Sequence, residues 1–303
     1  MKKILPLLFL VLIITGCGTQ NPTFMQANYV CSLQSPSFLQ KSTMIYMDKY
    51  MESSPITLNN QIYSIVFDRN NSTHLMQIDN IITNQHISTI TIGIGEYGSA
   101  IVSNNTVYVF LSNNSGTIGN QVTTISSTDL INWTAPQIVF NDSLNSIYNI
   151  SVCADATGFM MAYEIGRNGN YVHKFAHSAT IMGTYAQIGG TYTSYGYAAC
   201  PTIRYDAQYH KYYILYLNNL GGGNFDTFIY RTTDLRTFED SNIPAFMALS
   251  NEGTNNSDVD FTELNGQTYF LYAIGDQLTW GSIKIATAPM TNLQYLRSFF
   301  PVP

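Results

Sequence analysis

The segment Tyr212-Tyr213-Ile214-Leu215-Tyr216-Leu217 is one of five similar apolar runs that decide the fold. Its aromatic and aliphatic residues, bounded by turns that are rich in Asn, Asp and Gly, are typical of a buried β-strand. Comparable runs occupy residues 62–67, 107–111, 159–163 and 269–273, and another β-type segment precedes each of them. Because no long window has apolar residues at helical spacing, the sequence predicts an all-β protein.

The five runs recur at similar intervals. Equivalent positions are 45, 52, 53 and 56 residues apart, counted between Tyr63, Tyr108, Met160, Tyr213 and Tyr269. Repeats of about 50 residues with roughly four strands each are typical of a β-propeller. The sequence therefore predicts a five-bladed β-propeller with four-stranded antiparallel blades over residues 44–303. The alternative is a β-sandwich in which the similarities arise by chance.

A second motif repeats outside these runs. Ser127-Thr128-Asp129-Leu130-Ile131-Asn132-Trp133 is matched by Thr232-Thr233-Asp234-Leu235-Arg236-Thr237-Phe238. We interpret each as an Asp-Leu turn that closes an outer hairpin, with the following aromatic ring packed between neighbouring sheets. The alternative is a sialidase-type Asp box, but that motif requires a glycine and places its aromatic residue one position further from the aspartate.

Residues 1–17 have the features of an export signal. Lys2 and Lys3 precede an apolar run over residues 4–14, which is shorter than the ~20 residues needed to span a membrane. Ile14-Thr15-Gly16-Cys17 resembles the lipobox of bacterial lipoproteins, which implies lipidation of Cys17. We therefore expect a signal peptide over 1–16, a lipidated N-terminus and linker over 17–43 with a strand that closes the ring, and a lipid anchor in the cell envelope, at the outer membrane or cell surface. The alternative is an ordinary secretory signal and a freely diffusing product.

The charge and amino-acid composition of the chain indicate which class of molecule it binds. Without Lys2 and Lys3 the chain has 11 basic and 19 acidic residues, a formal charge of −8, and its basic residues are scattered. Nucleic acid is therefore an unexpected partner. Charged residues make up 11% of the chain and hydroxyl and amide residues abound, which suits a carbohydrate ligand. We expect a monomer whose contact with the membrane is the lipid alone.

Candidate site residues cluster at the starts of the predicted inner strands, which line the channel of a propeller. Alignment of the repeats puts Glu52 and Ser54 level with Asp258 and Asp260, and strand alternation points each pair the same way. The same register gives Asn149 and Ser151 in the third unit, and Ala198 and Cys200 in the fourth. Cys153 and Cys200 begin the inner strands of adjacent units, so a disulfide between them is one alternative.

Further polar residues are expected around the same mouth. Glu164 and Asp276-Gln277 follow second strands, Glu96 precedes a first strand, and Arg204 shares a face with Cys200. Each has a plainer interpretation: Asp258 and Asp260 could close a turn or bind a structural cation, Arg204 could pair with either of them, and Glu96 could be a solvated loop residue.

Glycoside hydrolysis uses carboxyl groups around one pocket: one acid protonates the leaving oxygen, and another carboxylate activates water or attacks the anomeric carbon. We expect Asp258 to be the base or nucleophile and Glu52 or Glu164 to be the acid. The expected substrate-binding residues are Asp260, Arg204, Asp276, Gln277, Glu96 and Asn149.

Over residues 45–300 the chain resembles the five-bladed propeller glycoside hydrolases, which include arabinofuranosidases, xylosidases and fructosidases. The resemblance rests on the segments 199–205 and 212–216, on the Asp-Leu turns, and on the segments 257–261 and 265–269. It implies a propeller fold and a glycosidase site at the mouth of the channel.

The chain departs from the family pattern at the positions that carry catalysis. The arabinofuranosidase type has an Asp before a proline in blade one, an Asp in blade three and a Glu two residues before a proline in blade four. The matching residues here are Ser54, Asn149 and Ala199, none of which exchanges a proton near neutral pH. Two hypotheses follow: the carboxylates are rebuilt from Glu52, Glu164, Asp258 and Asp260, or the protein is a carbohydrate-binding lipoprotein without hydrolysis.

No spacing of the five histidines indicates a metal centre, and we expect no required cofactor. A structural calcium ion in the channel is a further expectation.

Overall fold

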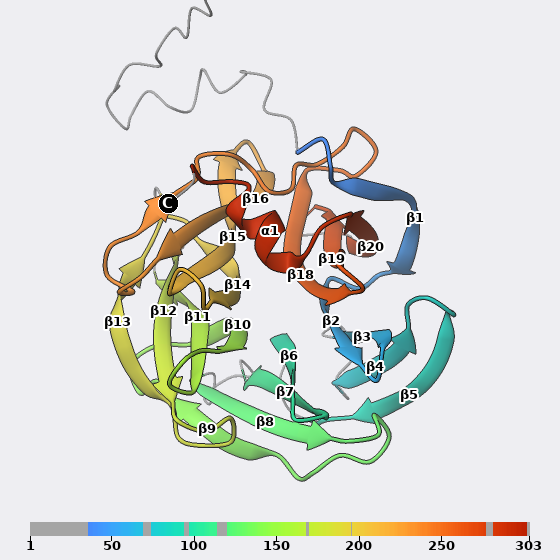
Figure 1. Cartoon of the computed structure of the whole chain (residues 1–303), viewed down its shortest axis with the longest axis vertical. Coiled ribbons are helices and arrows are strands. Elements are labelled where there is room, and N and C mark those ends of the chain that lie inside the picture. The colour runs from blue at the N-terminus through green and yellow to red at the C-terminus, as the bar shows by residue number, and fades with distance from the viewer. Residues whose placement is uncertain are drawn as a thin grey trace, which may run out of the picture. The chain divides into compact units, whose positions relative to one another are not determined.

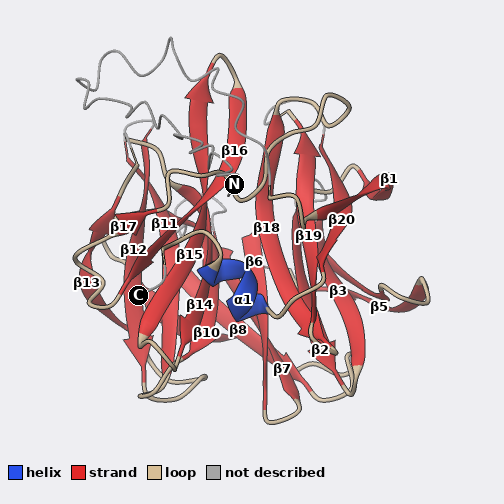
Figure 2. Ribbon diagram, turned by 45° about the horizontal axis from the view of Figure 1, so that its top comes forward, coloured by secondary structure: helices blue, strands red, loops and turns tan. Residues whose placement is uncertain are grey.

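The computed structural model describes residues 36–68, 74–93, 97–113, 120–167, 170–194, 196–276 and 281–301. The chain divides into the units Met1–Cys31 and Ser32–Pro303, and all the described residues lie in the second. This unit is built almost entirely of β-strands, as predicted, with one short helix, α1 (Asn292–Arg297) (Figure 2). Within the described residues, no helix has the length and apolar character that a membrane span requires.

Three antiparallel sheets of four strands follow one another along the chain, and in each sheet the strands pair in sequence order (Figure 1). The first sheet contains β2 (Glu52–Leu58), β3 (Gln61–Asp68), β4 (Leu75–Asn80) and β5 (Gln85–Thr91). The second contains β6 (Tyr97–Ser103), β7 (Thr106–Asn113), β8 (Gln121–Ser127) and β9 (Gln137–Asn141). The third contains β10 (Ile147–Ala154), β11 (Phe159–Arg167), β12 (Asn170–Ser178) and β13 (Ala186–Tyr192).

The remaining strands form one eight-stranded sheet with two antiparallel parts. One part contains β14 (Ala199–Asp206), β15 (Lys211–Gly221), β16 (Asn224–Thr232) and β17 (Glu239–Asp240). The other contains β18 (Asn255–Leu264), β19 (Gln267–Gly275), β20 (Gly281–Ala288) and β1 (Gln40–Asp48). A single parallel pair, Phe225 with Asn255, joins the two parts.

The first strands of these groups contact one another in a closed circuit, in the order β2, β6, β10, β14, β18 and back to β2. Hydrogen bonds connect several of these neighbours: Ser54 Oγ accepts from the Ala100 amide at 2.9 Å, and Ser151 Oγ accepts from the Ile203 amide at 3.1 Å. Between β14 and β18, Thr202 Oγ1 donates to the Val259 carbonyl at 2.7 Å. The sheets therefore surround a central channel, as in a propeller, while the number of five blades stays a prediction.

The circuit is held shut by β1, which pairs antiparallel with β20 although the two strands lie at opposite ends of the described chain. The predicted boundary between residues 43 and 44 falls inside this strand. Lys41 of β1 is almost completely buried and its Nζ donates to Glu252 Oε2 at 2.7 Å, while Lys284 Nζ of β20 donates to the other oxygen of Glu252 at 2.7 Å. Two cations on one buried carboxylate therefore fix β1 to the last strands.

Both Asp-Leu turns have the predicted role, connecting β8 to β9 and β16 to β17. Asp129 accepts from the amides of residues 131 and 132, and Asp234 accepts from those of residues 236 and 237. Leu130 and Leu235 have positive φ angles of 65° and 57°, and both side chains are buried. The aromatic ring after each turn packs between neighbouring sheets: Trp133 contacts apolar residues of the first and second sheets, and Phe238 those of the third sheet and of β14–β16.

Candidate active site

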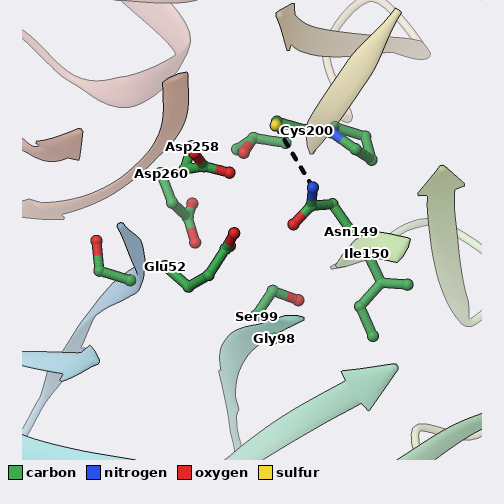
Figure 3. Close-up of a pocket in the computed structure, with 11 residues that line it drawn as sticks. Glu52, Gly98, Ser99, Asn149, Ile150, Cys200, Asp258 and Asp260 are labelled. Atoms are coloured by element: carbon green, nitrogen blue, oxygen red, sulfur yellow. Dashed lines mark hydrogen bonds between the residues drawn. The ribbon is translucent and has the colours of Figure 1, made fainter. Parts of the chain in front are cut away.

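A pocket opens near the start of the five inner strands, and each strand contributes two or three residues to it (Figure 3). The first of these residues on each strand are Glu52 of β2, Gly98 of β6, Asn149 of β10, Cys200 of β14 and Asp258 of β18. The pocket, with its open mouth included, has a volume of about 280 Å³. The carboxyl groups of Glu52, Asp258 and Asp260 point toward the same space, with Asn149 and Cys200 facing them.

A second level lies two residues further along each strand and is formed by Ser54, Ala100, Ser151, Thr202 and Asp260. The expected register for Glu52, Asn149 and Asp258 matches this arrangement, but that for the fourth unit was wrong: Cys200, not Ala198, lies at the mouth. The turn between β14 and β15 sets this register: Arg204 pairs with Tyr213 nine residues later, whereas the equivalent partners in β2–β3 and β18–β19 are seven residues apart. Cys200 itself has a φ of 49°, at a shift in the pairing between Ala199 and Thr202. Asp258 has a φ of 51° at the corresponding shift in β18.

Glu164 of β11 is buried directly behind the pocket. Its Oε2 accepts from Asn149 Nδ2 at 3.0 Å and from the Cys200 amide at 2.7 Å, and both donors belong to pocket-lining residues. Burial raises the pKa of Glu164 to about 7, and the negative charge of Asp258 acts in the same direction against these two hydrogen bonds. Near neutral pH this carboxyl therefore exchanges a proton, although it does not line the pocket.

The Cys200 thiol is influenced electrostatically by the three expected catalytic carboxylates. Burial raises its pKa well above the usual value, and the negative charges of Asp258, Glu164 and Glu52 raise it further. The charges of all three expected catalytic carboxylates therefore raise the pKa of the same thiol, which stays protonated near neutral pH. Cys153 and Cys200 are both free, so the disulfide considered between them is absent.

Asp260 and Arg204 form an ion pair inside the channel. Arg204 Nη2 lies 2.6 Å from Asp260 Oδ1, and Ser54 Oγ donates to Asp260 Oδ2 at 2.5 Å. The Arg204 guanidinium also lies over the Phe261 ring, 4.4 Å from its centroid. Arg204 lines a second cavity at the other end of the channel, of about 940 Å³ with its open end included, rather than the mouth pocket. Of the alternatives for Arg204, the structure contains the pair with Asp260.

The other expected site residues are not placed in the pocket. Asp276 follows the last residue of β19, is half-buried and does not line the pocket. Glu96, Gln277 and Cys17 lie outside the described residues. Sequence reasoning missed Gly98, although a signal existed: Gly98 pairs with Leu111, the last residue of its apolar run, as Glu52 pairs with Phe67.

The mouth is rich in oxygen atoms, but in the described ranges no group of three His, Cys, Asp or Glu side chains is arranged to hold a metal ion. Both carboxylate oxygens of Asp260 already accept hydrogen bonds from Arg204 and Ser54. A calcium ion in the channel stays a prediction, and no chemical step below depends on one.

No protein-family model matches the chain, and no curated protein matches it in sequence. Solved structures do match it in fold. A thermostable family-43 glycoside hydrolase superposes with a TM-score of 0.53 at 19% identity, covering 65% of this chain and 69% of that one. An alpha-L-arabinofuranosidase from Podospora anserina, solved with cellotriose, gives 0.60 at 12% identity, covering 84% and 99%.

A Bombyx mori beta-fructofuranosidase of family GH32, a mutant solved with sucrose, gives a TM-score of 0.58 at 11% identity, covering 78% of this chain and 61% of that one. At these identities the likeness is one of fold. The chain therefore shares the propeller architecture of these glycoside hydrolases.

Proposed function

We propose that this chain is an exported glycoside hydrolase with a five-bladed propeller, which cleaves an oligo- or polysaccharide at the mouth pocket. The observation that carries the proposal is the convergence of Glu52, Glu164 and Asp258 around Cys200. The fold shared with arabinose- and fructose-releasing enzymes supports the same reaction class. The five-strand circuit around the channel supports the blade count.

The geometry favours a division of labour among the three carboxylates. Glu52 and Asp258 line the pocket, so they are the groups that reach a bound sugar. In the proposed reaction Glu52 protonates the leaving oxygen, and Asp258 activates water or attacks the anomeric carbon. Glu164 holds Asn149 and the Cys200 amide in place, and its charge state changes the field at Asp258. Glu164 is therefore a positioning residue.

Substitution of the two pocket carboxylates tests this assignment. Purified protein is screened for release of reducing sugar from arabinan, xylan, fructan and algal and host glycans. On a substrate that is cleaved, Asp258→Asn and Glu52→Gln each lower kcat by a factor of about 100 or more, the usual contribution of an acid or base. Glu239→Gln, which removes a half-exposed carboxylate paired with Arg231 on the outer strands, is the matched control and keeps full activity. Activity that persists in Asp258→Asn refutes the assignment.

The location at the cell envelope is proposed from the N-terminal sequence. Lys2, Lys3 and the apolar run before Cys17 support export and lipidation, and several acyl chains anchor a protein stably whereas a single one does not. Cys17→Ala is expected to move the protein from the membrane fraction to the soluble fraction and to abolish incorporation of labelled palmitate. Unchanged membrane association in this variant would contradict lipidation at Cys17.

A second candidate function is glycan binding without hydrolysis. It is favoured by Ser54, Asn149 and Ala199, which stand where the resembling enzymes have acidic residues. In this case glycans bind to the wild-type protein and to Asp258→Asn, and no glycan that binds is cleaved.

A further inference from the structure

Four aromatic rings form a continuous row, and two of them, Tyr148 and Tyr197, lie within three residues in the sequence of Asn149 and Cys200, which line the mouth pocket. Tyr148 and Tyr171 meet edge to face with centroids 5.6 Å apart, and Tyr171 and Tyr197 do so at 5.2 Å. Phe225 extends the row, 5.7 Å from Tyr197. All four side chains are half-buried, so each ring keeps exposed surface. Contiguous exposed aromatic surface on a soluble protein marks a contact site for a ligand or partner.

The backbone supports this row from strands of two groups. Tyr148, Tyr171 and Phe225 lie at the starts of β10, β12 and β16, and Tyr197 bridges to Tyr171 just before β14 (Figure 1). The amide of Ala198 donates to the Tyr171 carbonyl at 2.7 Å, which links the third sheet to β14. Gly166 lies beneath two of the rings, since a Cβ atom there would be 2.8 Å from Tyr148 and 3.3 Å from Tyr171. The row is therefore built into the fold.

The row adjoins the candidate catalytic groups. Tyr148 directly precedes Asn149 of the pocket in the sequence. Burial raises the pKa of Tyr171 and of Tyr197, and the negative charge of Glu164 raises both further, as does that of Asp258 for Tyr197. The phenol groups of Tyr171 and Tyr197 therefore stay protonated near neutral pH.

The chemistry of the row fits sugar rings. The C–H faces of a sugar pack against aromatic rings, and a neutral phenol donates hydrogen bonds to sugar hydroxyls. Because Tyr171 meets both Tyr148 and Tyr197 edge to face, these three rings present faces and edges in alternation. A single sugar in the mouth pocket does not extend across two groups of strands, whereas a chain of sugars does.

We propose that Tyr148, Tyr171, Tyr197 and Phe225, the aromatic row, bind successive rings of a glycan chain whose one residue occupies the mouth pocket. The ligand is therefore an oligosaccharide chain that runs from the pocket over the starts of β10 and β12 toward β16, and the length of this chain sets its affinity. This inference rests on the proposed function, since the pocket is taken to hold a sugar.

Calorimetric titration of oligosaccharides of increasing length tests the aromatic row. Arabino-, xylo-, cello- and fructo-oligosaccharides of one to six units are titrated into Asp258→Asn, which removes turnover from the measurement. Affinity is expected to rise over the first few units. In the Asp258→Asn background, Tyr171→Ala and Tyr148→Ala are each expected to weaken binding of the longer chains by about tenfold, with the monosaccharide unaffected. Tyr205→Ala, at the other end of the channel, is the matched control and has no effect on affinity. Thermal unfolding confirms that each variant is folded.

The outcomes separate the two proposals. The proposal for the aromatic row is refuted if affinity does not depend on chain length. It is also refuted if longer chains bind Tyr171→Ala and Tyr148→Ala as tightly as the parent. Neither result contradicts sugar binding in the mouth pocket. Length-dependent binding that the tyrosine variants lose, with no release of reducing sugar by wild-type protein, supports the row and overturns hydrolysis. Absence of binding by every oligosaccharide overturns both.

Discussion

Replacement of Glu164 by glutamine should stabilise the protein at alkaline pH and leave it almost unchanged at acidic pH. Burial raises the pKa of this carboxyl from 4.5 to about 7 in the folded protein. A group whose pKa is raised by folding contributes stability below its unfolded pKa, and this contribution is lost as the pH rises through the folded pKa. The free energy of unfolding should therefore fall between pH 4.5 and pH 7 because of Glu164.

The pKa difference sets the magnitude. At about 1.4 kcal/mol per pH unit, the change from 4.5 to about 7 corresponds to roughly 3 kcal/mol. Glutamine carries no charge, and its side-chain oxygen can still accept from Asn149 and from the Cys200 amide. The difference in unfolding free energy between Glu164→Gln and wild type should thus grow from less than about 1 kcal/mol at pH 5 to about 3 kcal/mol at pH 8.

Urea denaturation at pH 5, 6, 7 and 8 measures this difference directly. Glu239→Gln is the control, because Arg231 lowers the pKa of that half-exposed carboxyl and its removal should not reproduce the rise. A difference between Glu164→Gln and wild type that is constant from pH 5 to pH 8 would refute the assignment of a raised pKa to Glu164.

Three further outcomes are expected. Lys41→Met should lower the free energy of unfolding by about 3 kcal/mol, because the buried Glu252 carboxylate loses one of its two cations; a change below about 0.5 kcal/mol in urea denaturation would contradict this role of β1. Arg204→Met should also lower it by about 3 kcal/mol, since Asp260 is left charged in the channel, and Arg204→Met with Asp260→Asn should recover part of the loss. Burial raises the pKa of the Cys153 and Cys200 thiols, so iodoacetamide at pH 8 should leave both unmodified in the folded protein and alkylate both in urea. Peptide mass spectrometry measures the modification. Rapid alkylation of the folded protein would show that the two cysteines are accessible thiolates.

Much of the fold could be predicted because it depends on local patterns. Each of the five apolar runs is the second strand of its group, and both Asp-Leu turns connect third to fourth strands. Period-two alternation and alignment of the repeats placed Glu52, Asn149 and Asp258 at the mouth, since side chains two residues apart share one face of a strand. These features require no knowledge of distant contacts.

The misplaced register in β14 had a different origin. It depends on the turn between β14 and β15, because Arg204 and Tyr213 pair nine residues apart whereas Ile56 and Tyr63 pair seven residues apart, and hydrophobic periodicity does not fix this length. The ion-pair partner of Arg204 could not be predicted either. Asp258 and Asp260 are two residues apart on one face of β18, and only the packing of β14 on β18 decides which of them Arg204 contacts. Such pairings depend on residues more than 50 positions apart.

The pairing of β1 with β20 makes completion of the last antiparallel group depend on a strand that is synthesised long after β1. Gln40 finds its partner only when Thr287 is available, so β1 stays without its pairing to β20 until that strand has been synthesised and released. A pairing between residues so far apart in the sequence forms slowly, because the entropy of closing the loop is lost before the contacts form. For the export proposed above, a fold whose late hydrogen bonds join the first and last strands of the described residues would postpone completion until both strands had crossed the membrane.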